Sequence, residues 1–400
     1  MSNNNNSNQA NNIAGGAEQT LLTHLGRWPE RHFGTVNAPV TRASTILFPD
    51  METLNNHSQP YTYGRRGTPS SEAVEEIVTA LEKGKGTRLT PSGLSALSCA
   101  IMSVVKAGDE ILVSDSAYEP TRMFCDKILA PMGVTARYFD PRAGADIAET
   151  ASDQTRAVLV ESPGSLTFEI QDLPAISSAL TGRDIAIIVD NTWATPLYYQ
   201  PLKLGADISV HAGTKMFVGH SDAMFGTITA NEKYWPQLLE THGFLGLCAA
   251  PDDCFLAARG LRTLAIRMKE HQSRALEIAS WLESHDLVTR VLHPGLASHP
   301  DHKIFARDFS GSGSLFSFEL VAGSQQAVAA MVDDLALFGL GYSWGGFESL
   351  ILPVKLGANR TIVPWQSKNP LVRLHIGLED IDDLKADLAA GLERYRAALG

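Results

Sequence analysis

The chain has 400 residues, of which 44% are hydrophobic and 19% are charged. This composition excludes a disordered polypeptide, a collagen and a small disulfide-stapled protein, and it provides for a large core. The 33 basic and 44 acidic residues leave a formal net charge of −11. Because such a surface repels polyanions, we expect no nucleic-acid or membrane partner and a small-molecule partner instead.

The N-terminal residues 1–16 are rich in asparagine and have neither a basic start nor an apolar stretch. This pattern argues against a signal peptide and predicts a disordered tail, which we assign to residues 1–20. No segment reaches the roughly 20 apolar residues that cross a bilayer. The four cysteines lack the spacing of a metal site or a disulfide framework. We therefore expect a soluble cytoplasmic protein without a metal.

Short apolar runs alternate with helical segments through the middle of the chain, at residues 110–113, 157–160, 185–189 and 208–210. Runs of this kind suit strands that are covered on both faces, and their alternation with helices predicts a mainly parallel sheet. In such sheets, ligands bind at the carboxyl ends of the strands.

The pattern changes to longer amphipathic stretches after about Arg262. The last of these, residues 383–399, has leucines at helical spacing behind an acidic start, as a helix N-terminus prefers. The sequence therefore predicts a second, smaller α+β domain at the C-terminus.

The segment 208–228 carries only two full charges, Lys215 and Asp222. A lysine that follows a buried strand in glycine-rich, apolar surroundings loses the stability of its ammonium form and becomes a nucleophilic amine. A lysine whose stem simply reaches solvent is an equal alternative on this segment alone.

Asp190 ends the strand 185–189, so its carboxylate should emerge at the carboxyl edge of the sheet. An aspartate at such a point is often only a helix cap. Together with Lys215, however, it matches what pyridoxal phosphate requires, namely a lysine for a Schiff base and an acid for the pyridine nitrogen.

Two further segments are candidates for the remainder of such a site. Tyr118 follows the strand 110–113, where its ring can cover a flat cofactor or face solvent, and the residues leave both open. The turn 90–96 leads into an apolar helix, which places the amides of Gly93 and Leu94 at a helix start that suits a phosphate. The loop 61–67 holds two arginines and two tyrosines, as an anion clamp or as an ordinary solvated loop.

Seven motifs in order carry a resemblance to the Cys/Met-metabolism family of pyridoxal-phosphate enzymes, from about residue 20 to residue 398. The resemblance implies the aspartate-aminotransferase type of fold, with a seven-stranded sheet between helices. It also implies a homotetramer in which paired subunits complete each other's sites. The motifs are Tyr-Gly-Arg-Arg-Gly-Thr (63–68), Ser-Ala-Tyr-Glu-Pro (116–120), Glu-Ser-Pro-Gly-Ser (161–165), Val-Asp-Asn-Thr-Trp (189–193), Gly-Thr-Lys-Met-Phe-Val-Gly-His-Ser-Asp (213–222), Ser-Trp-Gly-Gly-Phe-Glu-Ser (343–349) and Arg-Leu-His-Ile-Gly-Leu-Glu (373–379).

On this resemblance the chain divides into four parts. After the tail, residues 21–62 would be an extension that contacts the neighbouring subunit. Residues 63–262 would form the pyridoxal-phosphate-binding domain, and residues 263–400 the C-terminal domain.

The resemblance also assigns roles to single residues. Lys215 would hold the cofactor and act as the base, Asp190 would face the pyridine nitrogen, and Tyr118 would stack on the ring. Arg373 would bind the substrate α-carboxylate, a task that suits a planar bidentate donor. Further cofactor and substrate contacts would come from Gly93, Leu94, Thr214, Ser343 and Trp344, with Tyr63 and Arg65 reaching in from the neighbouring subunit.

Within the family, two departures favour members that cleave an amino-acid thioether by β-elimination, releasing homocysteine, pyruvate and ammonia from cystathionine. Trp344 stands where γ-acting members usually have a smaller residue, and Ser165 stands where many members have asparagine. The alternatives are γ-cleavage of cystathionine or methionine and desulfuration of cysteine.

Two unrelated functions are weaker alternatives. Residues 341–345 match the Gly-x-Ser-x-Gly pattern of serine hydrolases, with Ser343 as nucleophile, but only Glu348 precedes the last histidine downstream. His293, His299 and His302 have spacings that suit a metal, but no acidic or thiol ligand completes the set, so a polar surface loop is expected there.

Overall fold

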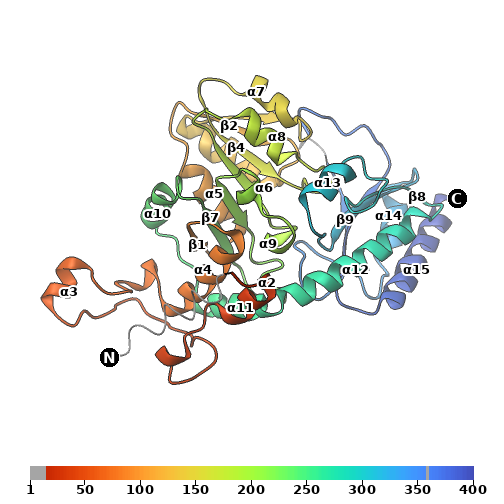
Figure 1. The fold of residues 1–400 in the computed structure, drawn as a ribbon. Helices are drawn as coiled ribbons and strands as arrows, with labels where there is room; N and C mark the ends of the chain where they lie inside the picture. Colours follow the sequence, from red (N-terminus) through yellow and green to blue (C-terminus); the bar gives the residue numbers. More distant parts are fainter. Residues whose placement is uncertain (1–14, 357–359) are drawn as a thin grey trace.

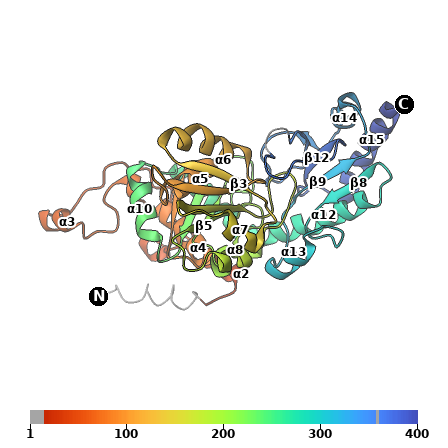
Figure 2. The same cartoon turned by 90° about the horizontal axis from the view of Figure 1, so that it is seen from above.

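The structure is a computed structural model that describes residues 15–356 and 360–400. Figure 1 and Figure 2 show a larger domain around one sheet and a smaller C-terminal domain beside it, with the long helix α12 (Leu264–Glu283) running between them. The predicted tail, residues 1–20, lies mostly outside the described residues, and helix α2 (Glu18–His24) begins within it. Within the described ranges, no helix is long and apolar enough to span a membrane.

The larger domain is built on a seven-stranded sheet with the strand order β1-β7-β6-β5-β4-β2-β3. β7 pairs antiparallel with both β1 and β6, and the other neighbours are parallel. The prediction of a mainly parallel seven-stranded sheet is confirmed. The strands are β1 (Gly86–Thr90), β2 (Glu110–Ser114), β3 (Thr135–Phe139), β4 (Thr155–Glu161), β5 (Ala186–Asp190), β6 (Ile208–His211) and β7 (Gly226–Ala230).

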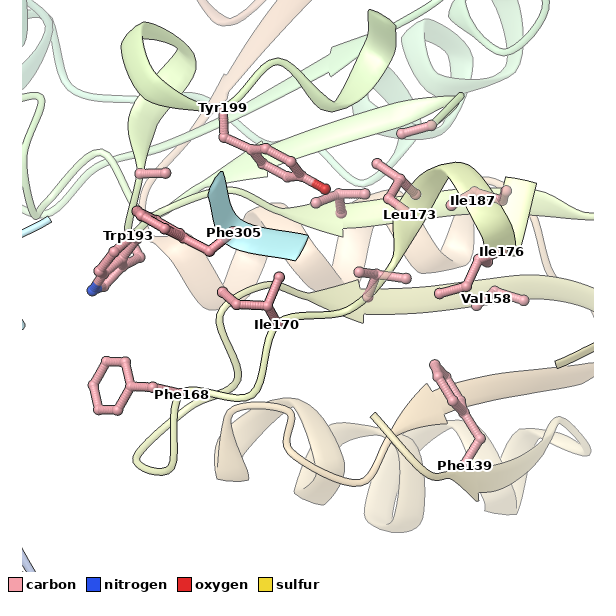
Figure 3. Close-up of a cluster of buried hydrophobic side chains, with 14 of the residues drawn as sticks. Phe139, Val158, Phe168, Ile170, Leu173, Ile176, Ile187, Trp193, Tyr199 and Phe305 are labelled. Carbon is pink, nitrogen blue, oxygen red and sulfur yellow. The ribbon is translucent and has the colours of Figure 1, made fainter. Parts of the chain in front are cut away.

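Both faces of this sheet are covered, because alternate residues of the central strands enter two different cores. In β4, Val158 and Val160 pack with residues of α7 and α8 in the cluster of Figure 3. Ala157 and Leu159 point to the other face, where α5 and α10 cover them. The helices of this domain are α3 (Met51–Asn56), α4 (Pro69–Glu82), α5 (Gly93–Met102), α6 (Glu119–Phe124), α7 (Ile147–Thr150), α8 (Leu173–Ala179), α9 (Thr195–Tyr198), α10 (Trp235–Phe244) and α11 (Pro251–Arg262).

The C-terminal domain has a five-stranded sheet of order β10-β11-β12-β9-β8, antiparallel except for the β10–β11 pair. Helices α12, α14 and α15 contribute the apolar residues that cover it. The predicted helix 383–399 is found as α15, where the Asp380 carboxylate accepts the amides of Asp382 and Asp383. The elements are β8 (Val288–Leu292), α13 (His302–Asp308), β9 (Leu315–Leu320), α14 (Gln325–Val332), β10 (Gly339–Leu340), β11 (Leu350–Val354), β12 (Leu371–His375) and α15 (Ile381–Leu399).

Asp115, which directly follows β2, joins the larger domain to the C-terminal domain through hydrogen bonds. Its carboxylate accepts the backbone amides of Thr361, Ile362 and Val363 at 2.9–3.0 Å. The buried Arg122 also donates to it, at 3.0 Å. Because Tyr118 lies three residues beyond Asp115, this junction ties the C-terminal segment to a candidate site residue.

Candidate active site

Asp190 and Lys215 lie at the same edge of the sheet, at the carboxyl ends of the neighbouring parallel strands β5 and β6. Asp190 is the last residue of β5 and lies opposite Val210 in β6. Lys215 follows β6 in a turn closed by its amide, which donates to the carbonyl of Ala212 at 3.0 Å. This placement agrees with the expectation that ligands gather at the carboxyl ends of parallel strands.

A short chain of hydrogen bonds holds the Asp190 carboxylate. Its Oδ1 atom accepts the Thr192 hydroxyl at 2.5 Å and the Thr192 amide at 3.0 Å. The Thr192 oxygen in turn accepts the amide of Ala212 at 2.8 Å. Burial raises the pKa of Asp190, whereas the bonds from Thr192 and the neighbouring His211 and Lys215 act in the opposite direction.

Lys215 extends toward a segment of the C-terminal domain. Its Nζ atom donates to Ser343 Oγ at 2.5 Å and lies 5.5 Å from the centre of a Trp344 ring. Burial and the positive charge of Arg373 lower the pKa of Lys215 to about 8. The lowered pKa leaves more of the Lys215 amine unprotonated near neutral pH than in an ordinary lysine.

Arg373 lies on β12 of the C-terminal domain, beside the same segment. Its Nη2 atom donates to the Ser343 carbonyl at 3.3 Å. Burial lowers the pKa of Arg373 to about 10, so the guanidinium keeps its charge at neutral pH. The structure thus brings Lys215, Ser343, Trp344 and Arg373 together from two domains.

Tyr118 lies where β2 leads into α6, and 45% of the residue is exposed. Its backbone amide donates to the Glu161 carboxylate at 2.6 Å. Burial and the adjacent Asp190 raise the pKa of Glu161 well above its usual value. Because Glu161 pairs with Asp190 across β4 and β5, the Tyr118 loop is anchored next to the strand ends that carry the site.

The start of α5 presents two backbone donors at this edge. The Ser92 side chain caps the helix by accepting the Ser95 amide, while the amides of Gly93 and Leu94 find no acceptor among the described residues. Gly93 packs so closely on Ala212 that a Cβ atom would lie 2.4 Å from the alanine methyl group. The free amides therefore lie beside the turn that carries Lys215, and such a helix start suits an anion.

The comparisons with known proteins agree with this geometry. Residues 19–393 match the family described as Cys/Met metabolism PLP-dependent enzyme. The chain belongs to this family.

Two relatives and one solved structure illustrate the similarity. The chain is 43% identical over 386 residues to the cystathionine β-lyase of Salmonella typhimurium and 42% identical to that of Escherichia coli, in each case over 94% of this chain and 98% of the relative. A crystal structure of cystathionine γ-synthase from Xanthomonas oryzae pv. oryzae, in complex with aminoacrylate and cysteine, has a TM-score of 0.89 at 33% identity and covers 96% of this chain. The match also covers 99% of the chain in that crystal structure.

The cofactor of this family member is pyridoxal 5′-phosphate, and the residues of the site fit it. The partly buried amine of Lys215, the Asp190 carboxylate and the free amides of Gly93 and Leu94 supply the three kinds of contact that an aldehyde, a pyridine nitrogen and a phosphate need. Thr214 is oriented differently from the other predicted contacts. Its hydroxyl donates to the carbonyl of Phe225 and accepts the amide of the same residue.

Tyr63 and Arg65 are not brought to the other site residues within one chain. Arg65 donates to the Gly243 carbonyl at 2.7 Å, at the end of α10, and its guanidinium lies 5.9 Å from the centre of the Tyr63 ring. In the described ranges, neither residue makes a hydrogen bond with Lys215, Asp190 or Tyr118.

Thr192 and Glu161 were not predicted as site residues, although both lie in motifs that carry the family resemblance. Thr192 stands two residues after Asp190, where a hydroxyl can return to a preceding carboxylate. Glu161 ends β4, and its position beside Asp190 follows once the strands are known to be neighbours. The signal was therefore present for both residues, but only the order of the strands reveals it.

The serine-hydrolase alternative has no support in the geometry. The hydroxyl of Ser343 contacts Lys215, not a histidine. His375 contacts Ser314 and the backbone of the 345–346 segment instead, and the Glu348 carboxylate accepts the Ser221 hydroxyl. The three residues of a triad are therefore engaged elsewhere.

The expectation of a polar surface loop around His293 and His299 is wrong. Both side chains are buried, and His293 packs against the rings of Trp193 and Phe316. The Nδ1 atoms of the two histidines accept backbone amides of the loop itself. Among the described residues, no group of three metal-ligating side chains is found.

Proposed function

We propose that this enzyme is a cystathionine β-lyase. Such a carbon–sulfur lyase converts L-cystathionine and water into homocysteine, pyruvate and ammonia. The observation that carries the proposal is the position of Trp344, whose ring lies 5.5 Å from Lys215 Nζ. γ-Elimination needs additional proton transfers at Cβ, and an indole beside the amine restricts the paths for them. The identity of 42–43% to relatives named cystathionine β-lyase, against 33% to a γ-synthase, supports the same assignment.

One group of residues would bind the cofactor, and another would bind the substrate. Asp190 would hold a proton on the pyridine nitrogen, the amides of Gly93 and Leu94 would receive the phosphate, and Tyr118 would cover the ring, whereas the Thr214 hydroxyl is engaged with Phe225. Pyridoxal phosphate, held by these residues, would supply an aldehyde that reacts with amines and a ring that accepts an electron pair from the substrate.

The substrate contacts come from the C-terminal domain. Arg373 binds the α-carboxylate and thereby orients the Cα–H bond toward Lys215. Lys215 removes the α-proton as a general base, a role that suits an amine whose pKa is lowered to about 8. Ser343 holds the Lys215 amine between these steps through its hydroxyl. Cleavage of the bond between Cβ and sulfur then releases homocysteine, and hydrolysis of the remaining fragment gives pyruvate and ammonia.

The products of one incubation test the assignment. Purified enzyme is incubated with L-cystathionine, and pyruvate and 2-oxobutyrate are measured in the same sample. We expect pyruvate, whereas a predominance of 2-oxobutyrate would assign the enzyme to γ-cleavage. The Trp344→Ala variant should raise the proportion of 2-oxobutyrate, and an unchanged product ratio would count against the role given to the indole.

We further propose a cytoplasmic homotetramer in which Tyr63 and Arg65 complete the site of the neighbouring subunit. The segment around α3 projects from the body of the chain in Figure 1 and carries exposed apolar side chains such as Leu47 and Met51. Mixing the Arg65→Ala and Lys215→Ala variants under subunit exchange tests this arrangement. Each variant alone should be inactive, and activity should return in mixtures because some sites then combine two intact halves. Mixtures that stay inactive would refute the shared site.

A further inference from the structure

The proposed mechanism gives no role to the buried imidazole of His375. His375 is the last residue of β12, two positions after Arg373, so both side chains lie on the same face of the strand. We infer that His375 is a positioning residue that holds the segment carrying Ser343 and Trp344 against Lys215. The inference rests on the proposed function for the role of Lys215 as the reacting amine.

His375 connects the core of the C-terminal domain to that segment. Only 1% of the residue is exposed. Its Nδ1 atom lies 2.7 Å from the Ser314 hydroxyl. Its Nε2 atom lies 3.2 Å from the Gly345 amide nitrogen and 3.1 Å from the Gly346 carbonyl oxygen.

The tautomer of the imidazole decides which backbone group the Nε2 atom binds. Burial lowers the pKa of His375 to about 3, so the imidazole is neutral and has one donor and one acceptor nitrogen. When Ser314 donates to Nδ1, Nε2–H donates to the Gly346 carbonyl. When Nδ1–H donates to Ser314, Nε2 accepts the Gly345 amide. Either tautomer therefore binds the backbone of the 345–346 segment.

The backbone at Gly345 must be kept in place because it lies very close to Lys215. Gly345 has a φ of +90°, and a Cβ atom there would lie 3.0 Å from the Cα, C and Cβ atoms of Lys215. Ser343, two residues earlier, has a φ of +76°, a conformation that non-glycine residues keep only when their surroundings fix it. A released Gly345–Gly346 segment would move the Ser343 hydroxyl and the Trp344 ring relative to Lys215 Nζ.

Two amide substitutions test which nitrogen of the His375 ring matters. In His375→Gln, the side-chain amide reaches the position of Nε2 and can still bind the Gly345 or Gly346 backbone. In His375→Asn, the amide reaches only the position of Nδ1 and contacts Ser314 alone. Because glutamine also fills more of the histidine volume than asparagine does, His375→Leu is the control for filling of space: leucine fills a similar volume but has no polar atom. His375→Leu should lose activity as His375→Asn does, and wild-type behaviour of His375→Leu would overturn the inference.

The holoenzymes are compared by two measurements. The first is kcat/KM for pyruvate release from cystathionine, which we expect to fall about 10- to 100-fold in His375→Asn and to stay close to wild type in His375→Gln. The second is the pH dependence of the absorbance of the bound cofactor, whose midpoint should shift in His375→Asn and not in His375→Gln. If His375→Asn does not yield folded protein, Ser314→Ala replaces it, because this variant loosens the ring without emptying its position.

His299→Asn is the matched control, because His299 is also buried and accepts a backbone amide, that of Asp301, at 3.2 Å. It should leave both measurements unchanged. Equal effects of His375→Asn and His375→Gln, or wild-type behaviour of His375→Asn, would overturn the inference. If the wild-type enzyme released no pyruvate, the proposed function would fail, while the absorbance comparison would still test His375.

Discussion

Replacing Asp115 by asparagine should destabilise the protein strongly, because this carboxylate joins the two domains. Its side chain is fully buried, and that of its partner Arg122 is 6% exposed. Asparagine has the same shape but carries no charge, and its NH₂ group cannot accept the amides of the 361–363 segment. The variant also leaves the guanidinium of Arg122 buried without its counter-charge.

The pKa of Asp115 sets the size of the effect. Its value is lowered from 3.8 to about 2, by the backbone amides of Val363, Thr361 and Ile362 against the opposing effect of burial. A difference of this size corresponds to about 2 kcal/mol of folding free energy. Because the folded-state pKa is the lower one, this contribution is complete at neutral pH and disappears as the pH falls from about 4 through about 2.

Urea unfolding at fixed protein concentration measures the difference. At pH 7 the free energy of unfolding of Asp115→Asn should be lower than that of wild type by at least about 2 kcal/mol, since the unpaired arginine adds to the loss. Asp252→Asn is the control, because Asp252 pairs with Arg42 at the exposed surface, and it should unfold like wild type. The reasoning is refuted if Asp115→Asn also unfolds like wild type, or if the gap does not narrow as the pH is lowered from about 4 to about 3.

Two further predictions concern the amine and the acid of the site. Thr192→Val removes the hydroxyl that donates to Asp190, so the pKa of Asp190 should rise and the acidic limb of the kcat/KM profile should move up by about one pH unit. An unmoved limb would show that the hydroxyl does not stabilise the charged form. Arg373→Leu removes a positive charge that lowers the pKa of Lys215, so the pH for half-maximal cofactor uptake by the cofactor-free protein should rise above about 8. A midpoint that stays at about 8 in stopped-flow measurements would contradict this cause.

The strands and the ligand edge could be predicted from the sequence because their signals are local. The apolar run before Asp190 forms β5, and the one before His211 forms β6. The contact of Lys215 with Ser343 spans 128 residues, and the family resemblance assigned both residues to one site without predicting that they touch. The burial of His293 could not be predicted either, since its loop is rich in polar residues and prolines and its packing partners are remote in sequence. Tertiary packing decided both cases.

The division of the site between two domains has a consequence for its sensitivity to mild stress. Lys215 belongs to one folding unit, and its hydroxyl partner and carboxylate clamp belong to another. A slight parting of the units would separate these groups while each sheet stays intact. Catalysis should therefore fade at denaturant concentrations too low to change the circular dichroism, which makes turnover an early reporter of interdomain loosening.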